Sequence, residues 1–439
     1  MLSQMGHILV SLADSLMVGR LGAVPLASVS LAISIISVIL LFGIGVSYGL
    51  TPLVAAADGE GDTRKSASVL KHGILLNLVV GVILLALTLG AAEVLPYFGQ
   101  EEAVLNGALP YLRILAYGMF PLMIFQTFRQ FAEGLSYTKQ SMFISISANV
   151  LNVCLNYVFI FGKLGFPAMG LFGAGLATLI SRIVMAISMA GFILLSRRFI
   201  SYRIHMSSIT LTKKSFRQIL RIGIPSGLQY IFEVGAFSAA AIMVGWTGAV
   251  ALAAHQIALN LSAITYMTAT GIAAAATIRV GNQLGRKDIF TLRRAGMTCF
   301  MMAGIFMGVC AIIFTFGNKI LPTFYINDIE VIQYASTLLI IAAFFQISDG
   351  IQAVGLGVLR GLADVKVPTY VTMVAFWFMS IPIGYVLGIV FDYGARGIWI
   401  GLLTGLSVAA VLHVYRFRNL TSRLLVEYGS NSREESKLD

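Results

Sequence analysis

Three carboxylates stand inside long apolar stretches of the sequence. Glu233 and Asp349 lie near the middle of two such stretches, and Asp14 lies near the end of a third. The local stretches QYIFEVGAFSAAAIMV, AFFQISDGIQAVG and LVSLADSLMVG contain no Lys or Arg. An ionised carboxylate at the centre of a membrane-spanning helix costs about 2.5–3.5 kcal/mol, so it normally faces a protein-lined cavity and binds a positive group. The pattern predicts a membrane protein that handles cations. The alternative for Glu233 and Asp349 is a structural pair of hydrogen-bonding acids in a tight core.

A row of amides accompanies Asp14. Asn149, Asn152 and Asn156 recur at helical spacing and therefore share one face of a helix, and Thr178 adds a hydroxyl in the next apolar stretch. Carboxylate, amide and hydroxyl oxygens are hard donors, which suit Na⁺ better than a soft metal. The row predicts a Na⁺ site in the first half of the chain. An interhelical hydrogen-bond cluster is the alternative.

Other polar residues and motifs point to transport rather than catalysis. Gln256 is a candidate for lining a central cavity, whereas a packed, neutral imidazole is the favoured interpretation of the adjacent His255. The sequence has no GxxxxGK[ST] phosphate loop, no HExxH and no Ser/His/Asp constellation. Its three cysteines show no metal-binding spacing. We therefore expect a protein that is not an enzyme, has no cofactor and makes no direct use of ATP.

The elements that must position these residues are long apolar segments. Hydrophobic residues make up 58% of the 439 residues, charged residues only 11%, and the mean hydropathy is +0.88, which is too apolar for a soluble fold. A spanning helix needs about 20 apolar residues, and the absence of strand-type alternation excludes a transmembrane barrel. We predict an all-α membrane protein of twelve transmembrane helices. They are expected at residues 2–18, 26–50, 72–92, 109–128, 141–161, 170–195, 222–245, 250–276, 296–316, 332–358, 368–390 and 396–415.

The net charge of +11 is explained by membrane topology. If the N-terminus is cytoplasmic, 24 of the 30 Lys and Arg residues fall on that side and 5 on the other, with Arg182 inside a helix. Cytoplasmic segments of membrane proteins carry such an excess. We therefore expect both termini in the cytoplasm and no nucleic-acid partner. Seven of the basic residues lie at 196–221, and contact of the stretch RRFISYRIH within it with anionic lipid is a minor additional interpretation.

The two halves of the chain repeat. Residues 17–62 align with 243–288 without a gap, and fourteen of the forty-six positions are identical; EGLSYTK and RGLADVK match further along. Parallel repeats of this kind imply a pseudo-twofold axis along the membrane normal, with a binding cavity between the halves. We predict an N-lobe at 1–205 (helices 1–6), a C-lobe at 206–420 (helices 7–12) and a polar cytoplasmic tail at 421–439. Helix 1 lacks a counterpart of TKKSFRQILRIGIPS, so the written start is expected to be late or trimmed.

Several stretches resemble the MATE (multidrug and toxic compound extrusion) family, in its NorM-like branch. They are ADSLMVGRLGAVPLASVSL, GVSYGLTPLVAAADGEGD, FEVGAFSAAAIMVGWTGAVALAAHQIALNL, RVGNQLGRKD and DGIQAVGLGVLRGLADVKVP. The resemblance covers essentially the whole chain. It implies an antiporter of the bacterial inner membrane, with two lobes of six helices, that expels cationic amphipathic drugs in exchange for Na⁺ or H⁺. We also expect a monomer.

The resemblance assigns roles to particular residues. The C-lobe site comprises Glu233, Asp349 and Gln256, and the N-lobe cation site comprises Asp14, Asn152, Asn156, Ala174 and Thr178. Two departures bear on the coupling ion. Phe345 stands where NorM-like proteins can carry a tyrosine, and Asn156 stands where archaeal-type members have an aspartate. We favour Na⁺, with H⁺ as the alternative.

Two other functions remain as alternatives. A lipid-linked oligosaccharide flippase of the same superfamily should line its cavity with Arg and Lys to hold pyrophosphate, yet this chain has three acids and only Arg182 within a helix. A non-transporting membrane receptor or scaffold predicts no buried acids at repeat-related sites and usually an extra soluble domain. Drug accumulation in cells with and without the protein would separate the three functions.

Overall fold

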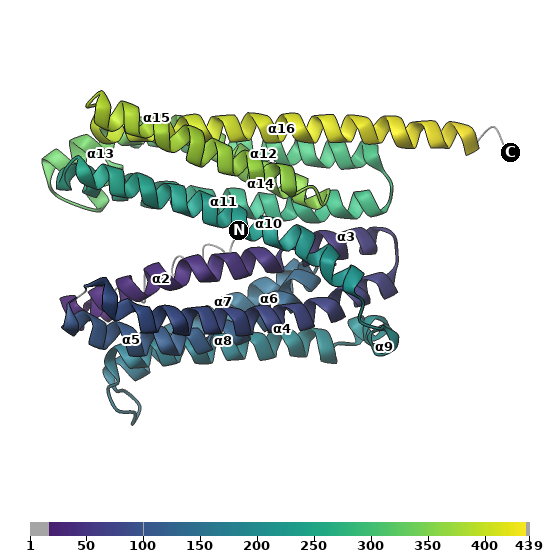
Figure 1. Cartoon of the computed structure of the whole chain (residues 1–439), viewed down its shortest axis with the longest axis horizontal. Helices are drawn as coiled ribbons and strands as arrows, with labels where there is room; N and C mark the ends of the chain where they lie inside the picture. Colours follow the sequence, from purple (N-terminus) through teal and green to yellow (C-terminus); the bar gives the residue numbers. More distant parts are fainter. Residues whose placement is uncertain (1–16, 100, 436–439) are drawn as a thin grey trace. The chain divides into compact units, whose positions relative to one another are not determined.

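The computed structural model describes residues 17–99 and 101–435, and the regular elements in these ranges are all helices (Figure 1). The first set is α2 (Ala23–Ser47), α3 (Leu50–Gly59), α4 (Thr63–Val94), η1 (Leu95–Phe98), α5 (Glu102–Tyr117), α6 (Met119–Gly134), α7 (Thr138–Phe161), α8 (Gly170–Leu195), η2 (Arg197–Phe199) and α9 (Ile200–Ser208). The second set is α10 (Lys213–Trp246), α11 (Ala249–Gly285), α12 (Ile289–Gly317), η3 (Leu321–Phe324), α13 (Ile329–Gly361), α14 (Lys366–Met373), α15 (Ile381–Tyr385) and α16 (Gly394–Glu435). Two π-helical segments flank α15, at Val374–Ser380 and Val386–Val390.

Eleven helical segments of the described residues are long and apolar enough to cross a membrane. The predicted first span, 2–18, lies almost wholly outside the described residues, so the eleven agree with the other predicted spans. The prediction of an all-α membrane protein is confirmed. Several helices run past the apolar stretches: α10 begins at Lys213, whereas the predicted span begins at 222. Polar residues with good helix propensity continue a helix beyond the hydrocarbon layer, so apolar run length underestimates its extent.

The chain divides into two compact units, and the boundary between them along the chain falls within α10. We call residues 2–227 the N-terminal unit and residues 228–439 the C-terminal unit. The lobe bounds expected from the sequence, 1–205 and 206–420, rest on the internal repeat rather than on contacts. They stay a prediction.

The two units make the same helix contacts at repeat-related positions. In the N-terminal unit, Thr51 Oγ1 on α3 lies 3.4 Å from the carbonyl oxygen of Gln130 on α6 and donates to the side-chain oxygen of the same residue. In the C-terminal unit, Thr277 Oγ1 on α11 donates to the carbonyl oxygen of Gly357 on α13, at 2.8 Å. The threonines are 226 residues apart and the acceptors 227. The repeat seen in the sequence is therefore also a repeat of contacts between a threonine hydroxyl and the backbone of a neighbouring helix.

Gly134 and Gly361 occupy repeat-related positions at which two helices pack closely. A Cβ added to Gly134 would lie 2.8 Å from Val54 Cβ, and a Cβ added to Gly361 would lie 2.9 Å from Val280 Cβ. Real Cβ atoms do not approach neighbouring carbons so closely without a shift in the packing. Glycine at these positions lets the two helix backbones pack closely, as small residues do in membrane helix pairs.

Helices α4 and α12 begin with equivalent caps. Asp62 accepts a hydrogen bond from the backbone N–H of Lys65 at 2.8 Å, and Asp288 accepts one from the backbone N–H of Thr291 at 2.9 Å. Aspartate is a preferred capping residue because its carboxylate pairs with an amide that the helix leaves without a partner. The Thr291 hydroxyl also bonds to Asp288, and these bonds lower the pKa of the Asp288 carboxyl.

A short interruption at Gly118 divides the predicted span 109–128 into α5 and α6. Pro121 lies in the first turn of α6, where a residue without an N–H is tolerated. Arg182 of α8 reaches this point, and its Nη1 donates to the carbonyl oxygen of Leu115 at 3.4 Å. A cation beside the carbonyl end of a helix is favourable because it complements the helix dipole.

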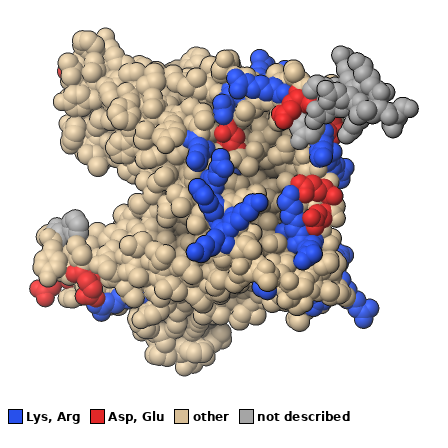
Figure 2. All heavy atoms as spheres, turned by 45° about the vertical axis from the view of Figure 1, so that its right-hand side comes forward, with Lys and Arg blue, Asp and Glu red and all other residues tan. Residues whose placement is uncertain are grey.

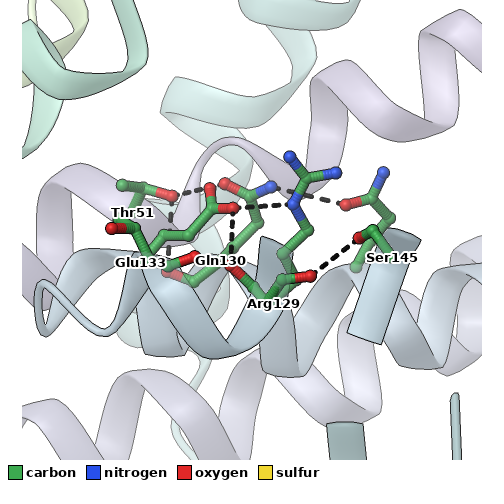
Figure 3. Close-up of polar contacts among 8 residues, drawn as sticks. Thr51, Arg129, Gln130, Glu133 and Ser145 are labelled. Atoms are coloured by element: carbon green, nitrogen blue, oxygen red, sulfur yellow. Dashed lines mark hydrogen bonds and ion pairs between the residues drawn. The ribbon is translucent and has the colours of Figure 1, made fainter. Parts of the chain in front are cut away.

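A polar cluster lies at the end of α6 in the N-terminal unit (Figure 3). Arg129 Nε donates to Glu133 Oε1 at 2.7 Å, and Ser141 Oγ of α7 donates to the same oxygen at 3.2 Å. Thr51 of α3 donates to the Gln130 side-chain oxygen. The Arg129 and Glu133 side chains are only 12% and 14% exposed, so this ion pair is largely shielded from water. The cluster joins α3, α6 and α7.

Candidate ion and substrate site

Two of the three predicted acids lie together in the C-terminal unit. Glu233 comes from α10 and Asp349 from α13, and their exposed fractions are only 6% and 4%. The two carboxylates are close enough to interact electrostatically. Like charges that share a poorly solvated site repel each other, and a bound cation or proton relieves the repulsion. The structure thus brings together the two acids that the sequence analysis singled out.

Tyr266 of α11 joins the acid pair. Its hydroxyl donates to Glu233 Oε1 at 2.8 Å and lies within electrostatic range of both carboxylates. Gln352 approaches Glu233 from the turn of α13 that follows Asp349. Neither atom of the Gln352 amide has a hydrogen bond of normal geometry in the described part of the chain, although the side chain is fully buried. The Gln352 amide therefore keeps hydrogen-bonding capacity that a bound ion, water or ligand can use.

Arg360 is a basic residue near Glu233 that the sequence did not indicate. No Lys or Arg lies near Glu233 along the chain, and this absence favoured a cation-binding role over a structural one. In the structure α13 brings Arg360 into electrostatic range of Glu233. The separation in sequence is 127 residues, so only the packing of α13 against α10 reveals it. Arg360 offsets part of the negative charge, but two carboxylates still face one arginine.

Phe345 fills the position one turn before Asp349. It is buried, with its ring centroid 6.0 Å from that of Phe237 and 5.5 Å from that of Trp399. No hydroxyl is available there, as the sequence indicated. The hydroxyl near the acid pair comes instead from Tyr266 on α11.

The predicted polar group of the N-terminal unit also forms. Asn152 Nδ2 donates to Thr178 Oγ1 at 3.4 Å, and Asn156 Nδ2 donates to Asn152 Oδ1 at 3.2 Å. Thr178 Oγ1 in turn donates to the carbonyl oxygen of Ala174 at 3.1 Å. Four of the five proposed N-lobe residues are therefore connected across α7 and α8. The fifth, Asp14, lies outside the described residues.

Gln256 lies apart from the acid pair. Its side chain is exposed within the unit and donates to Asn260 Oδ1 at 3.3 Å. Gln256 precedes Tyr266 by ten residues on α11, which corresponds to about 15 Å along the helix axis. The adjacent His255 is buried, and its Nδ1 accepts a hydrogen bond from Trp399 Nε1 at 3.0 Å. His255 is thus part of the packed interior.

Sequence reasoning missed Tyr266, Gln352 and Arg360. Gln352 follows Asp349 by three residues, so helical spacing alone placed both on one face of α13. Tyr266 stands opposite Leu40 in the internal alignment, and this exchange of an apolar residue for a hydroxyl was a usable signal. Arg360 follows Gln352 by eight residues, but nothing in the sequence shows that α10 packs beside it.

Comparison with known proteins identifies the family. The family model named MatE matches residues 1–158 and 225–386, which is more than half of the chain. The chain belongs to the MatE family. As a member, it is a membrane transporter and not an enzyme, as the sequence predicted.

Curated MatE relatives match over nearly their full length. "Probable multidrug resistance protein NorM" of Idiomarina loihiensis is 34% identical over 427 residues, covering 96% of this chain and 92% of the relative. "Multidrug resistance protein NorM" of Photobacterium profundum is also 34% identical, covering 92% and 90%. "Multidrug resistance protein MdtK" of Yersinia pseudotuberculosis is 33% identical, covering 95% and 92%.

Solved MATE structures share the fold. "Crystal structure of MATE in the bent conformation" matches with a TM-score of 0.90 at 21% identity, covering 98% of this chain and 94% of the other. An outward-facing multidrug resistance MATE transporter of the MOP superfamily matches with a TM-score of 0.89 at 22% identity, covering 97% and 94%. The predicted fold class, an all-α membrane protein with the MATE fold, is confirmed.

Proposed function

We propose that this MatE protein is an ion-coupled antiporter that exports cationic, amphipathic drugs and toxic organic compounds. The observation that carries the proposal is the buried pair Glu233 and Asp349, with Tyr266 donating to Glu233 and the Gln352 amide beside it. Such a site is suited to a positive ligand. The names of the relatives, which are multidrug resistance proteins, support the same assignment.

Exchange follows if drug and ion compete for the acid pair. A carboxylate neutralised by an entering ion no longer attracts the outgoing cationic drug, so the two ligands exclude each other at Glu233 and Asp349. Each ligand then favours a different arrangement of the transporter, inward-facing or outward-facing, and alternation between the two carries the drug out. The free energy comes from the ion gradient, without ATP or a bound cofactor.

We favour Na⁺ as the coupling ion, with H⁺ as the alternative. Na⁺ needs several oxygen ligands, and the N-terminal unit offers Asp14, the amides of Asn152 and Asn156, the Thr178 hydroxyl and the Ala174 carbonyl. A proton needs only a carboxylate, which Glu233 and Asp349 supply. The acid pair is therefore the place where H⁺ would act.

The remaining parts of the proposal concern location and partners. We place the protein in the bacterial inner membrane as a monomer. Both termini are assigned to the cytoplasm because the predicted topology puts most basic residues on the side that the termini share. Its partners are then small cationic substrates and the lipid bilayer, with no nucleic acid.

Dye efflux from proteoliposomes tests the antiporter assignment and the ion together. We expect an imposed Na⁺ gradient to drive efflux of a cationic dye, and Glu233→Gln and Asp349→Asn to abolish it. Asp288→Asn is the matched control, because it removes a carboxylate at a helix cap that asparagine also forms. Normal efflux by the double variant would refute the role of the acids. Full efflux driven by a pH gradient in Na⁺-free buffer would refute Na⁺ as the coupling ion.

A second comparison tests whether the two sites have separate roles. If the N-terminal unit holds the ion, Asp14→Asn should reduce the dependence of efflux on Na⁺ more than it reduces drug binding. Asp349→Asn should reduce drug binding itself. Equal loss of drug affinity in the two variants would indicate one shared site.

A further inference from the structure

A strongly basic surface extends over η2, α9 and the first turns of α10 in the N-terminal unit. Residues 196–221 contain no Asp or Glu but seven basic residues: Arg197, Arg198, Arg203, Lys213, Lys214, Arg217 and Arg221. None of the seven forms an ion pair with a carboxylate of the described residues. Figure 2 brings the α9 end of Figure 1 forward and shows Lys and Arg side chains gathered there. We call residues 196–221 the linker surface.

The linker surface is a folded part of the N-terminal unit. Phe199 is fully buried, and its ring packs against those of Phe192, Tyr137 and other aromatic residues. Lys71 Nζ of α4 donates to the carbonyl oxygens of Met206 and Ile209, at 2.8 and 2.7 Å. These contacts hold α9 against α4 in one orientation.

That orientation turns two isoleucines outward. Ile200 and Ile204 are four residues apart on α9 and therefore lie on one face of the helix. Their exposed fractions are 43% and 64%. Arg197 and Arg198, immediately before α9, are exposed as well. The short helix thus presents apolar and cationic side chains together, as amphipathic helices at membrane interfaces do.

We propose that the linker surface binds the headgroups of anionic phospholipids, with Ile200 and Ile204 inserted among the adjoining acyl chains. Basic segments beside membrane helices gain free energy from anionic lipids, and an apolar face adds burial in the interface. Membrane topology alone accounts for an excess of positive charge. It does not account for the outward isoleucines or for the contacts that fix α9. Exposed basic side chains and exposed isoleucines occur together on the linker surface, which is the combination expected of a surface that binds lipid.

The test compares equal charge removal from two basic segments predicted on the same side of the membrane. The linker variant carries Arg197→Gln, Arg198→Gln, Lys213→Gln and Lys214→Gln. The control variant carries Arg286→Gln, Lys287→Gln, Arg293→Gln and Arg294→Gln. Purified protein is titrated with phosphatidylglycerol, and with phosphatidylcholine as the neutral probe, and bound lipid is counted by native mass spectrometry.

We expect the linker variant to lose phosphatidylglycerol affinity by at least about tenfold, because each basic residue near an anionic surface contributes about fivefold. The control variant should retain at least about threefold higher phosphatidylglycerol affinity than the linker variant, and phosphatidylcholine binding should not change. Equal losses in the two variants, or no loss in either, would overturn the proposal. Arg197→Lys with Arg198→Lys keeps the charge and should keep the affinity, which separates lost charge from misfolding.

Insertion of the apolar face is measured separately. A fluorophore attached at Ile204→Cys, in protein whose three native cysteines are replaced by serine, should be quenched by phospholipids brominated near the glycerol backbone. Quenching should be stronger in phosphatidylglycerol bilayers than in phosphatidylcholine bilayers. A fluorophore that only aqueous iodide quenches would show that α9 stays in water and would refute insertion. Both measurements report binding, so neither outcome depends on the transported substrate.

Discussion

Removing one charge from the acid pair should weaken the binding of a cation by a predictable factor. A unit positive charge about 4 Å from a carboxylate interacts with it by about 4 kcal/mol at an effective dielectric constant of about 20. Because about 1.4 kcal/mol corresponds to a factor of ten, the upper limit for Asp349→Asn is roughly a thousandfold loss. Asp349 is buried, so solvent screening removes little of this. We expect a loss of about 100- to 1000-fold.

Glu233→Gln should cost at least as much. Arg360 interacts with the Glu233 carboxylate, and the substitution would leave the Arg360 charge without this compensation. The bound cation would then lose the attraction of the Glu233 carboxylate, and the Arg360 guanidinium would also repel it. If Glu233 and Asp349 contact one cation directly, the double variant should lose more than either single variant. If instead they share a proton and only one is charged, the second substitution should cost little.

The assay is equilibrium binding of tetraphenylphosphonium to purified protein, beside a neutral analogue of similar shape. Both acid variants should bind the neutral analogue within about threefold of wild type, because burial of its apolar surface does not depend on charge. Asp288→Asn should leave both affinities unchanged. Two results would refute the reasoning: cation affinity within about threefold of wild type in both single variants, or parallel losses for the charged and neutral ligands.

Three further predictions concern stability. Arg182→Gln removes the guanidinium beside the carbonyl of Leu115 and should destabilise the protein by about 1.5 kcal/mol, the lower end for a charged hydrogen bond because 3.4 Å is long; Arg182→Lys should recover part of the loss of melting temperature. Gly134→Ala and Gly361→Ala should each cost about 1–3 kcal/mol by overpacking, and to a similar extent because the contacts are repeat-related; a fluorescence-based thermal shift would reveal any unequal response. The pKa of Asp288 is lowered in the folded protein, so its cap stabilises α12 above the ordinary carboxyl pKa of about 3.9 and is lost as pH falls through the lowered value. Asp288→Ala should therefore lower the melting temperature at pH 7, and its difference from wild type should shrink below about pH 4.

The acids could be predicted from the sequence because a charge inside an apolar stretch is conspicuous and has few explanations. Tyr266 could not be predicted as easily, since tyrosine is common in apolar helices and its role depends on the rotation of α11 toward α10. Gln256 is assigned to the same site by the family resemblance. It precedes Tyr266 by ten residues on α11, a rotation roughly 80° short of three full turns, so the two side chains leave the helix in different directions. Its role at the site stays a prediction.

The helices could be predicted better than their ends and interruptions. Apolar run length identifies a span because the hydrocarbon layer sets a minimum length. It does not identify where α10 begins, since Lys213 and the residues after it continue the helix in polar surroundings. The break at Gly118 was missed although Gly118 and Pro121 stand close together. Their effect depends on a third residue, Arg182, which reaches the break only through the packing of α8.

In the internal repeat, residues that pack helices together are identical in the two halves, whereas residues of the candidate sites differ. Thr51 and Thr277 are identical residues at equivalent positions, and the hydroxyl of each contacts the backbone carbonyl of an equivalent residue on a neighbouring helix. Glu233 instead stands opposite His7 in the alignment, and Asp349 stands opposite Leu122. Contacts that hold helices together persist in both copies, whereas the residues proposed to bind ions and substrates do not.

Two copies that differ in polar chemistry can bind different ligands while keeping the same helix contacts. The N-terminal unit presents neutral amides and a hydroxyl around Thr178, which suits an ion that seeks several oxygens. The C-terminal unit presents two carboxylates, which suit a proton or an organic cation. Exchange of the residues at the two sites between the copies would therefore be expected to exchange ligand preference without unfolding either unit. In particular, Asn152→Ala should reduce the Na⁺ dependence of efflux while leaving tetraphenylphosphonium affinity within about threefold, and a parallel loss of both would contradict the division of roles.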